Sequence, residues 1–317
     1  MKSLKENEFH TFEQILELNQ KNLKHVMFKF LKSKYNKVIN HNNYICAEGT
    51  IPIALVAHLD TVFKHPPKDI FYDQKKKVMW SPQGLGADDR AGIFAIIQII
   101  KSGLRPHIIL TTDEEVGGIG ADLLSKNGNP FADLRYIIQL DRRGNADCVF
   151  YNCNNTEFID YVESFGFAEA YGTFTDISIL CPAWKVAGVN LSVGYVNEHS
   201  FIETLYLNAL NSTINKVKKM LIEEDIPKFD YIAFSNRPIS SFYDVCGICN
   251  KPFFTENLIP FTRKDGQLDY ICGDCIVDNV NWCALCNHPY EPKDRSVSSF
   301  DPKQVNICPV CEKERMN

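Results

Sequence analysis

The sequence predicts an α/β fold with a mostly parallel central sheet flanked by helices, followed by a small C-terminal domain rich in cysteine. Strand-like runs rich in isoleucine and valine alternate with helical segments over the first two-thirds of the chain, which is typical of a parallel sheet covered on both faces. Eight of the 12 cysteines lie in residues 246–311. Residues 224–244 lose the periodicity and contain two prolines. We therefore predict a domain over 1–223, a linker over 224–244 and a second domain over 245–317.

The elements of the first domain are predicted from hydrophobic spacing and from residues that end helices. Apolar residues at the i, i+3 and i+4 spacing predict the first helix, and Gly103 and Pro106 end the second. Thr156 is expected to cap the helix that it opens. The predicted helices cover 11–34, 89–102, 119–126, 156–166 and 201–223. The predicted strands cover 51–58, 107–112, 136–141, 147–153 and 188–193, with a hairpin at 69–80.

The composition is that of an ordinary globular protein. The chain has 317 residues, 45% hydrophobic and 23% charged, and its net charge of −5 gives no support for binding to nucleic acid or to an anionic membrane. Residues 1–10 carry charges but no apolar stretch of the kind that a secretory signal has. The longest apolar run, 91–100, is about half as long as a membrane span. We expect a cytoplasmic protein.

Five short segments, spread over 142 residues, carry imidazole or carboxylate side chains of the kind that bind metal ions. Four of them directly follow a strand-like run or lie in the turn after one, and such positions meet at the carboxyl edge of an open sheet. Each residue alone has a structural explanation, such as a helix cap or a hydrogen-bonded core histidine. Together and in this order they predict a two-metal hydrolase. The segments are AHLDTVF with His58, GLGADDRAG with Asp88, TTDEEVGG with Glu114 and Glu115, IIQLDRRG with Asp141, and NEHSFIE with His199.

These residue types suit hydrolysis of an amide bond. Two metal ions about 3.5–4 Å apart activate a water molecule and polarise the carbonyl group, and a carboxylate acts as base. Asp60 is placed to hold the second ring nitrogen of His58. Asp88 follows two glycines that allow a tight turn, and its carboxylate could bridge both ions. Glu114 and Glu115 are adjacent, so one can bind metal while the other reaches the water.

Over residues 9–223 the chain resembles the co-catalytic zinc peptidases, a group of aminopeptidases, tripeptidases and glutamate carboxypeptidases. The resemblance lies in the order of five motifs, which are HLDT, GADDRAG, DEE-x-G, a strand-ending aspartate and NEHS-x-x-E. YGTFTDISIL, with Thr175 and Asp176, is similar to a segment of the aminopeptidases. The resemblance implies that Glu114 is the general base, that Asp60 orients His58 and that the Asp88–Asp89 peptide bond is cis. It further implies one zinc on His58, Asp88 and Asp141, and another on Asp88, Glu115 and His199.

The chain departs from this group in its spacing. Only 29 residues separate His58 from Asp88, and 57 separate Asp141 from His199, so neither gap has room for an inserted lid domain. We therefore predict a bare catalytic domain of the compact aminopeptidase type. The resemblance implies that a lid histidine, which helps to polarise the carbonyl in other members, is missing. Tyr171 or Tyr195 could replace it, and the alternative for both is aromatic packing.

The C-terminal cysteines form four CxxC pairs, separated by 22, 7 and 21 residues. This pattern predicts two structural zinc sites with four cysteines each. The echo of CGICNKPF in CALCNHPY favours sequential pairing, as in two zinc ribbons or treble clefs, over a cross-braced RING-like module. His288 could replace one cysteine. The pairs are Cys246 and Cys249, Cys272 and Cys275, Cys283 and Cys286, and Cys308 and Cys311.

The remaining cysteines and histidines are predicted to have no part in metal binding. The tail 245–317 has 8 Lys and Arg against 10 Asp and Glu, which favours a structural or protein-docking role over contact with nucleic acid. The thiols expected to be buried are Cys46, Cys148, Cys153 and Cys181. The histidines expected at the surface or in loops are His10, His25, His41, His65 and His107.

The sequence thus predicts a zinc-dependent metallopeptidase or amidohydrolase, aminopeptidase-like, that acts on a peptide or amide substrate. It would hold two catalytic and two structural zinc ions, and its water would be activated by Glu114. The alternative is an inert hydrolase fold that serves as a zinc-scaffolded interaction module. In either case the C-terminal domain could bind a protein partner.

Overall fold

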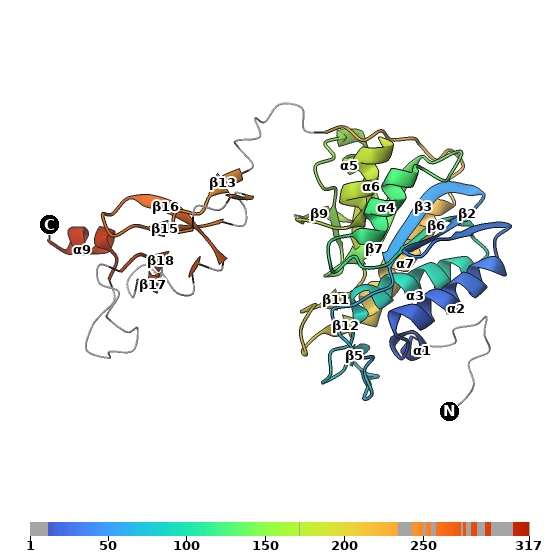
Figure 1. Cartoon of the computed structure of the whole chain (residues 1–317), viewed down its shortest axis with the longest axis horizontal. Helices are drawn as coiled ribbons and strands as arrows, with labels where there is room; N and C mark the ends of the chain where they lie inside the picture. The colour runs from blue at the N-terminus through green and yellow to red at the C-terminus, as the bar shows by residue number, and fades with distance from the viewer. Residues whose placement is uncertain are drawn as a thin grey trace. The chain divides into compact units, whose positions relative to one another are not determined.

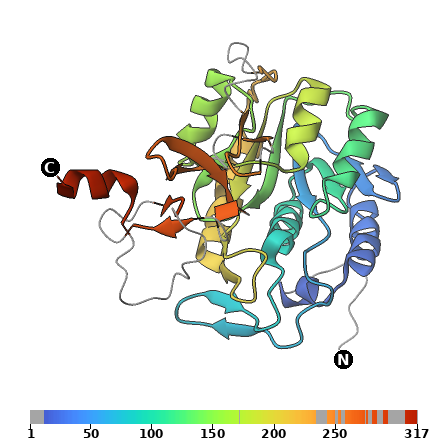
Figure 2. The same cartoon turned by 60° about the vertical axis from the view of Figure 1, so that its left-hand side comes forward.

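The computed structural model describes residues 12–170, 172–233, 243–249, 252–254, 258–273, 275–276, 280–283, 289–292 and 307–316. The chain forms two compact units, one up to residue 234 and one from residue 235 on. This division falls within the segment 224–244. Figure 1 labels the elements of both units along the chain, and Figure 2 shows them from a second side.

A large sheet forms the centre of the first unit (Figure 1), with the strand order β1-β2-β6-β3-β7-β10-β8-β9. Strands β3, β6, β7 and β10 are parallel to their neighbours in this group, whereas β2 pairs antiparallel with both β1 and β6, and β8 pairs antiparallel with β10. The prediction of a mostly parallel sheet therefore holds for the centre, and the whole sheet is mixed. Its strands are β1 (Lys37–Asn40), β2 (Tyr44–Glu48), β3 (Ile51–His58), β6 (Pro106–Thr111), β7 (Tyr136–Arg142), β8 (Asp147–Val149), β9 (Ala168–Glu169) and β10 (Gly188–Ser192).

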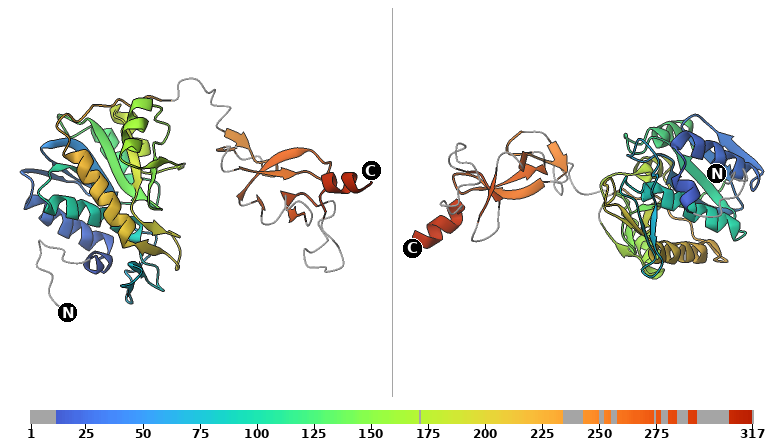
Figure 3. Two further views of the ribbon diagram at one scale, coloured as in Figure 1. Left: turned by 180° about the vertical axis from the view of Figure 1, so that it is seen from behind. Right: turned by 90° about the horizontal axis from the view of Figure 1, so that it is seen from below.

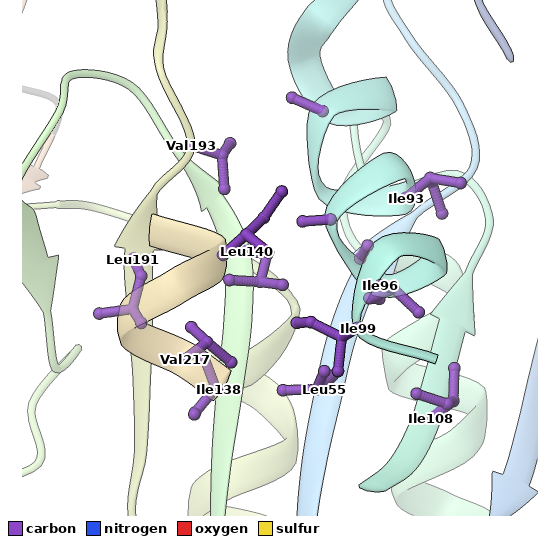
Figure 4. Packing of buried hydrophobic residues seen from close by; sticks show 14 of the residues in the cluster. Leu55, Ile93, Ile96, Ile99, Ile108, Ile138, Leu140, Leu191, Val193 and Val217 are labelled. Carbon is purple, nitrogen blue, oxygen red and sulfur yellow. The ribbon is translucent and has the colours of Figure 1, made fainter. Parts of the chain in front are cut away.

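Helices cover both faces of this sheet, because side chains of its central strands alternate between two apolar cores. Leu55 of β3 belongs to the core with α2, α3 and α7, which lie in front in the left view of Figure 3, and Val56 belongs to the core with α4 and α6. Figure 4 shows side chains of α3 and α7, such as Ile99 and Val217, packed on those of β3, β7 and β10. Burying each such side chain contributes about 1.5–3 kcal/mol. The helices are α1 (Glu13–Leu16), α2 (Gln20–Lys32), α3 (Ala87–Lys101), α4 (Ile119–Asn127), α5 (Thr156–Ser164), α6 (Asp176–Trp184) and α7 (Leu207–Leu221).

A second, smaller sheet has the order β11-β12-β5-β4 and contains the predicted hairpin as β4 (Phe71–Asp73) and β5 (Val78–Trp80). The other strands are β11 (Tyr195–Val196) and β12 (Thr204–Tyr206). The predicted helix 201–223 is therefore wrong at its start. Residues 204–206 pair with β5, and they alternate between exposed and buried side chains as a strand does.

Three further boundaries differ from the prediction. The predicted helix 11–34 is two helices, because Asn19 Oδ1 accepts a hydrogen bond from the Asn22 N–H (2.9 Å) and opens α2 there. Asn155, and not Thr156, caps α5, since its Oδ1 accepts from the Phe158 N–H (3.1 Å). Strand β8 ends at residue 149, and residues 150–153 do not continue it.

The first unit extends beyond residue 223, where the sequence places the start of the linker. Ile226 and Phe229 are buried in its core, and Asp230 and Ala233 form isolated β-bridges with Val186 and Cys153. Among the described helices, none combines the length and the apolarity needed to cross a membrane.

The second unit has little apolar core of its own. Its two described clusters of buried residues consist of Cys246, Leu258, Phe261, Ile271 and Cys272, and of Cys283, Tyr290 and Cys308. Cysteines thus make up half of the residues in these two described clusters. Its elements are β13 (Tyr243–Val245), β14 (Pro252–Phe254), β15 (Leu258–Thr262), β16 (Leu268–Cys272), β17 (Asn281–Trp282), β18 (Pro289–Tyr290) and α9 (Pro309–Met316).

Candidate metal centre

The predicted ligands come together at the carboxyl edge of the parallel strands. His58 is the last residue of β3, and Asp141 lies one residue before the end of β7. Glu115 lies in the turn between β6 and α4, and His199 follows β11 in a turn where its own φ is 60°. Asp88 lies at the start of α3. Each strand directs its ligand to the edge where ligands bind in open α/β sheets.

Two groups of three predicted ligands share Asp88. His58 Nε2 lies 3.1 Å from Asp88 Oδ1 and 3.4 Å from Asp141 Oδ1. On the other side, His199 Nε2 lies 3.2 Å from Asp88 Oδ2 and 3.0 Å from Glu115 Oε2. In each group the three ligand atoms lie within 4.8 Å of one another. The two oxygens of Asp88 thus face different histidines, which is the arrangement a bridging carboxylate needs.

Asp60 connects the first group to the turn that carries Glu115. Its Oδ1 lies 3.3 Å from His58 Nδ1, and its Oδ2 accepts a hydrogen bond from the Glu115 N–H at 3.1 Å. Burial acts to raise the pKa of Asp60, but the neighbouring His58 and this N–H outweigh it and lower the pKa to about 2. Asp60 therefore remains a carboxylate and lies beside the His58 ring, as its predicted role requires.

Asp141 is held by donors from three elements. Its Oδ2 accepts hydrogen bonds from Gln139 Nε2 (3.0 Å) and Thr175 Oγ1 (2.9 Å), and its Oδ1 accepts from the Tyr195 hydroxyl (3.1 Å). Its backbone N–H donates to Asn190 Oδ1 at 2.9 Å. The roles of Gln139 and Asn190 were not predicted. Gln139 lies two residues before Asp141 on the same face of β7, a local signal that the sequence does contain, whereas Asn190 lies 49 residues away.

The hydrogen bond between Tyr195 and Asp141 involves one of the two tyrosines that could polarise the carbonyl group of a substrate. The Tyr195 hydroxyl gives its hydrogen to this carboxylate, and the residue is 2% exposed. The Tyr195 hydroxyl therefore binds Asp141, one of the predicted ligands. The other predicted candidate, Tyr171, lies outside the described residues.

A buried carboxylate, Glu203, holds the loop that carries Asp88. It is fully buried, and its Oε2 and Oε1 accept hydrogen bonds from the Gly86 N–H (2.5 Å) and the Asp88 N–H (3.0 Å). Burial raises the pKa of Glu203 to about 7, and the two N–H groups act against this shift. Because both oxygens face N–H donors, the arrangement fits the ionised form. The sequence motif NEHS-x-x-E contains Glu203, but the motif gave no role for it.

The start of α3 is fixed to both β3 and β7. The Asp88–Asp89 peptide bond is cis, as the resemblance implied. Asp89 Oδ2 accepts from the His58 N–H (3.2 Å), and Oδ1 accepts from the Gly92 N–H (2.9 Å). A Cβ atom on Gly92 would collide with the Leu140 carbonyl oxygen and with Asp89, so only glycine allows α3 to approach β7 this closely.

Carboxyl groups outnumber imidazoles in the two groups of predicted ligands, and Glu114 and Asp176 add two more buried carboxyl groups near them. Burial raises the pKa of Glu114 to about 9 and that of Asp176 to about 7. Contacts with Asp88 and Glu115 raise the pKa of His199 to about 11. The buried Oε1 of Glu115 has no hydrogen-bond partner among the described residues. Imidazole and carboxylate donors with an unpaired buried oxygen fit divalent metal ions, for which such donors are the usual ligands.

Four of the five predicted ligands line a cavity of about 320 Å³, a size at the lower end of ligand-binding pockets. They are Asp88, Glu115, Asp141 and His199, and Glu114 lines the same cavity. The remaining wall differs in chemistry, because it is lined by two arginines and three aromatic residues. These residues are Arg142, Arg143, Tyr151, Phe174 and Tyr195, with Glu198 beside them.

The second unit gathers its cysteines in two clusters. Cys246, Cys249, Cys272 and Cys275 lie within 4.8 Å of one another at their sulfur atoms, and so do Cys283, Cys308 and Cys311. Cys249 Sγ lies 4.0 Å from Cys272 Sγ, and the Cys272 N–H donates to Cys246 Sγ (3.4 Å). The first CxxC pair thus lies with the second, and the described cysteine of the third lies with the fourth. Cys286 and His288 lie outside the described residues.

The other cysteines and histidines mostly follow the prediction. Cys46, Cys148, Cys153 and Cys181 are free and buried, which confirms their assignment. His25 and His65 are exposed, His41 is half-buried, and His10 lies outside the described residues. The prediction for His107 is wrong, since it is a buried residue of β6.

Specific contacts hold the His107 ring in place. Nδ1 accepts from the Gly49 N–H (3.0 Å), Nε2 lies 2.8 Å from the Asp133 carbonyl oxygen, and the ring stacks on Phe131 with centroids 4.2 Å apart. Burial lowers the pKa of His107.

Comparison with known proteins found solved structures that are similar to this chain, but no match by sequence. No family model matches the chain, and no curated protein matches it. A tripeptidase from Staphylococcus aureus is similar in structure, with a TM-score of 0.55 and 13% identity, over 67% of this chain and 96% of the other. A TET aminopeptidase from a marine sediment archaeon of the Thaumarchaeota has a TM-score of 0.52 and 13% identity, over 68% and 96%. The aminopeptidase PepT from Bacillus cereus has a TM-score of 0.51 and 14% identity, over 66% and 96%. The first unit thus has the α/β fold of these aminopeptidases and tripeptidases.

Proposed function

We propose that the first unit is a metal-dependent peptidase that hydrolyses a peptide or amide bond in an aminopeptidase-like reaction. The observation that carries this proposal is the position of Asp88, whose two oxygens lie 3.1 Å and 3.2 Å from the nitrogens of two different histidines. One shared carboxylate between two imidazole–carboxylate groups is suited to a pair of ions. The fold that the chain shares with a tripeptidase and two aminopeptidases supports the same reaction class.

Each ion would be held by one of the two ligand groups. His58, Asp88 and Asp141 would hold the first, and Asp88, Glu115 and His199 the second. Zinc suits these donors, as cobalt and manganese do. When bound, such a pair lowers the pKa of a water molecule and polarises the carbonyl group of the substrate.

The side chains of the cavity would supply the rest of the chemistry. Glu114 lines the cavity beside the ligands, and we assign it as the general base that takes the proton from the attacking water and passes it to the leaving amine. Asp60 keeps the His58 ring oriented with Nε2 toward Asp88. Gln139, Thr175 and Tyr195 hold Asp141 through its carboxylate oxygens.

Replacing Glu114 tests the assignment of the base. Glu114→Gln keeps the shape of the side chain but removes its basicity, so we expect turnover of peptide substrates to fall by about 10²- to 10⁴-fold. The zinc content of the purified protein, measured by elemental analysis, should not change. Glu157→Gln, at an exposed carboxylate of α5, is the matched control and should retain full turnover. Retained activity in Glu114→Gln would refute the role of the base.

The cysteine clusters of the second unit are proposed as two structural zinc sites. A tetrahedral site with Zn–S bonds of about 2.3 Å has sulfur atoms about 3.8 Å apart, close to the 4.0 Å between the sulfur atoms of Cys249 and Cys272. Because half of the residues in the two described apolar clusters of this unit are cysteines, the zinc ions would supply much of its folding free energy.

A second candidate function is an inert hydrolase fold that acts as a zinc-scaffolded interaction module. The cysteine-rich second unit, which no catalytic step requires, is the observation that favours it. The number of zinc ions per chain separates the two functions. Four zinc ions per chain in the full-length protein would support an occupied catalytic pair. Two zinc ions per chain, both lost in a double variant with Cys272→Ser and Cys308→Ser, would support the interaction module.

A further inference from the structure

The cavity wall that faces the metal ligands carries two consecutive arginines. Arg142 and Arg143 follow Asp141 directly in the sequence, and both line the cavity. Arg143 Nη1 lies 3.1 Å from Glu198 Oε1, and the Arg143 side chain is 56% exposed. Most of the hydrogen-bonding fork of this guanidinium therefore remains accessible to a molecule in the cavity.

The backbone that carries Arg143 is fixed. Its carbonyl oxygen accepts a hydrogen bond from Ser192 Oγ (2.7 Å), and the next N–H, of Gly144, donates to the Tyr195 carbonyl oxygen (2.9 Å). These two bonds connect the segment after β7 to the end of β10 and to the start of β11. Because the backbone is held, Arg143 loses less conformational freedom when it binds a ligand.

Charge decides what this wall can bind. Arg142, Arg143 and Glu198 line this wall, so their side chains together carry a charge of +1 when all three are ionised. A protonated amine would be repelled here, whereas a carboxylate would be attracted. The planar fork of arginine matches a carboxylate in two parallel hydrogen bonds, which lysine cannot provide.

We propose that Arg143 is a specificity-determining residue that binds a carboxylate of the substrate. This inference rests on the proposed peptidase function, and it names the substrate class as short peptides with a carboxylate close to the scissile bond. The cavity of about 320 Å³ suits a short substrate. The carboxylate has two possible sources, the C-terminus of a dipeptide or tripeptide and the side chain of an aspartate or glutamate.

Matched pairs of peptides distinguish these sources. Trialanine and trialanine amide differ only in the C-terminal charge, and glutamyl-alanine amide and glutaminyl-alanine amide differ only in the side-chain charge. For the zinc-loaded full-length protein we expect kcat/KM to be about 10- to 100-fold higher for the charged member of one pair. This is the factor that corresponds to the free energy of one hydrogen bond between charged groups. The pair that shows the preference identifies the source. Equal kcat/KM within both pairs would overturn the proposal.

Two variants tie the preference to Arg143. Arg143→Gln should abolish it by raising KM for the charged peptide with little change in kcat, and Arg143→Lys should restore only part of it. Lys126→Gln is the matched control, because Lys126 is also an exposed cation in an ion pair, with Asp122 at 2.6 Å, on α4. A preference that persists in Arg143→Gln would refute the assignment even if the wild-type protein shows it.

Calorimetric binding separates this inference from the proposed function. If no peptide is hydrolysed, the peptidase proposal fails, and binding of the same peptide pairs still tests Arg143. Stronger binding of the charged member, lost in Arg143→Gln, supports the carboxylate site. Equal binding of both members refutes it. Turnover without any charge preference refutes the carboxylate site and leaves the peptidase function standing.

Discussion

Glu203 offers a test of how the site is held together without any change to a ligand. Both of its oxygens accept backbone N–H groups of the loop before α3, at 2.5 Å from Gly86 and 3.0 Å from Asp88. In Glu203→Gln, one oxygen becomes an NH₂ group that faces an N–H donor. The variant therefore loses one hydrogen bond to a charged group and leaves one buried donor unpaired.

The magnitude follows from these two losses. A hydrogen bond to a charged group contributes about 1.5–3 kcal/mol, and an unpaired buried donor costs about 1–3 kcal/mol. Relaxation of the loop would recover part of this sum, so we expect a loss of about 3 kcal/mol, which lowers the unfolding midpoint of a domain of this size by roughly 6–12 °C. Because Asp88 belongs to both ligand groups, zinc affinity at both catalytic sites should fall about 10- to 100-fold.

The assay is a competitive zinc titration against a chelating dye, together with thermal unfolding, on the full-length protein. Glu163→Gln is the matched control, since Glu163 Oε1 also accepts a backbone N–H, from Glu169 at 3.1 Å, but at an exposed position far from the ligands in sequence. The control should retain both zinc affinity and unfolding midpoint. If Glu203→Gln also retains both, Glu203 does not hold the loop and the reasoning fails.

Three further predictions concern other parts of the structure. Burial lowers the pKa of His107 below the value of about 6.5 that the residue has in the unfolded chain. The contribution of His107 to stability is therefore present above that pH and is lost as the pH falls. We expect His107→Gln to reduce the drop in the urea midpoint between about pH 7.5 and pH 5.5. Gly92→Ala should destabilise the first unit by about 1–3 kcal/mol in urea unfolding, because its Cβ would collide with the Leu140 carbonyl oxygen. Cys272→Ser should remove one zinc per chain by elemental analysis and make the second unit sensitive to protease, since it removes one sulfur of a four-cysteine cluster.

Each of these variants has a control. His25→Gln, on the exposed side of α2, should keep the full pH dependence, and an unchanged drop in His107→Gln would contradict the prediction. Gly273→Ala adds a Cβ where nothing lies within 4 Å, so it should be neutral, and equal midpoints for Gly92→Ala and wild type would show that the close approach does not matter. Cys148→Ser removes a thiol outside the clusters and should leave the zinc content unchanged.

The sequence predicts those parts of the fold and site that depend on local pattern. The run at 51–58 forms β3 because it is almost continuously apolar, and most of the predicted ligands could be named because they follow such a run or lie in the turn after one. His107 was misassigned because it follows Pro106, yet proline is tolerated as the first residue of a strand. Residues 204–206 were assigned to a helix because their partner strand, β5, lies more than a hundred residues earlier.

The residues that hold the ligands could not be predicted for a related reason. Glu203 bonds to N–H groups 115 and 117 residues away in the sequence, and Asn190 bonds to Asp141 across 49 residues. A glutamate or an asparagine has no local pattern that distinguishes such a role from a solvated position. Only the sheet order, which places β10 beside β7, brings Asn190 to its partner.

The order of strands in the large sheet has a consequence for how the chain acquires its ligands during synthesis. The five strands β1-β2-β6-β3-β7 are neighbours and are all complete by Arg142, while β10, β8 and β9 extend the sheet from one side. A growing chain has therefore made His58 and Asp141 on one contiguous half-sheet, and Asp88 at the start of α3, before His199 has been made. The 57 residues between Asp141 and His199 take roughly 3–11 seconds at usual rates of translation. The site is thus completed in two stages, and the last histidine arrives together with Glu203, the residue that fixes the loop of the shared aspartate.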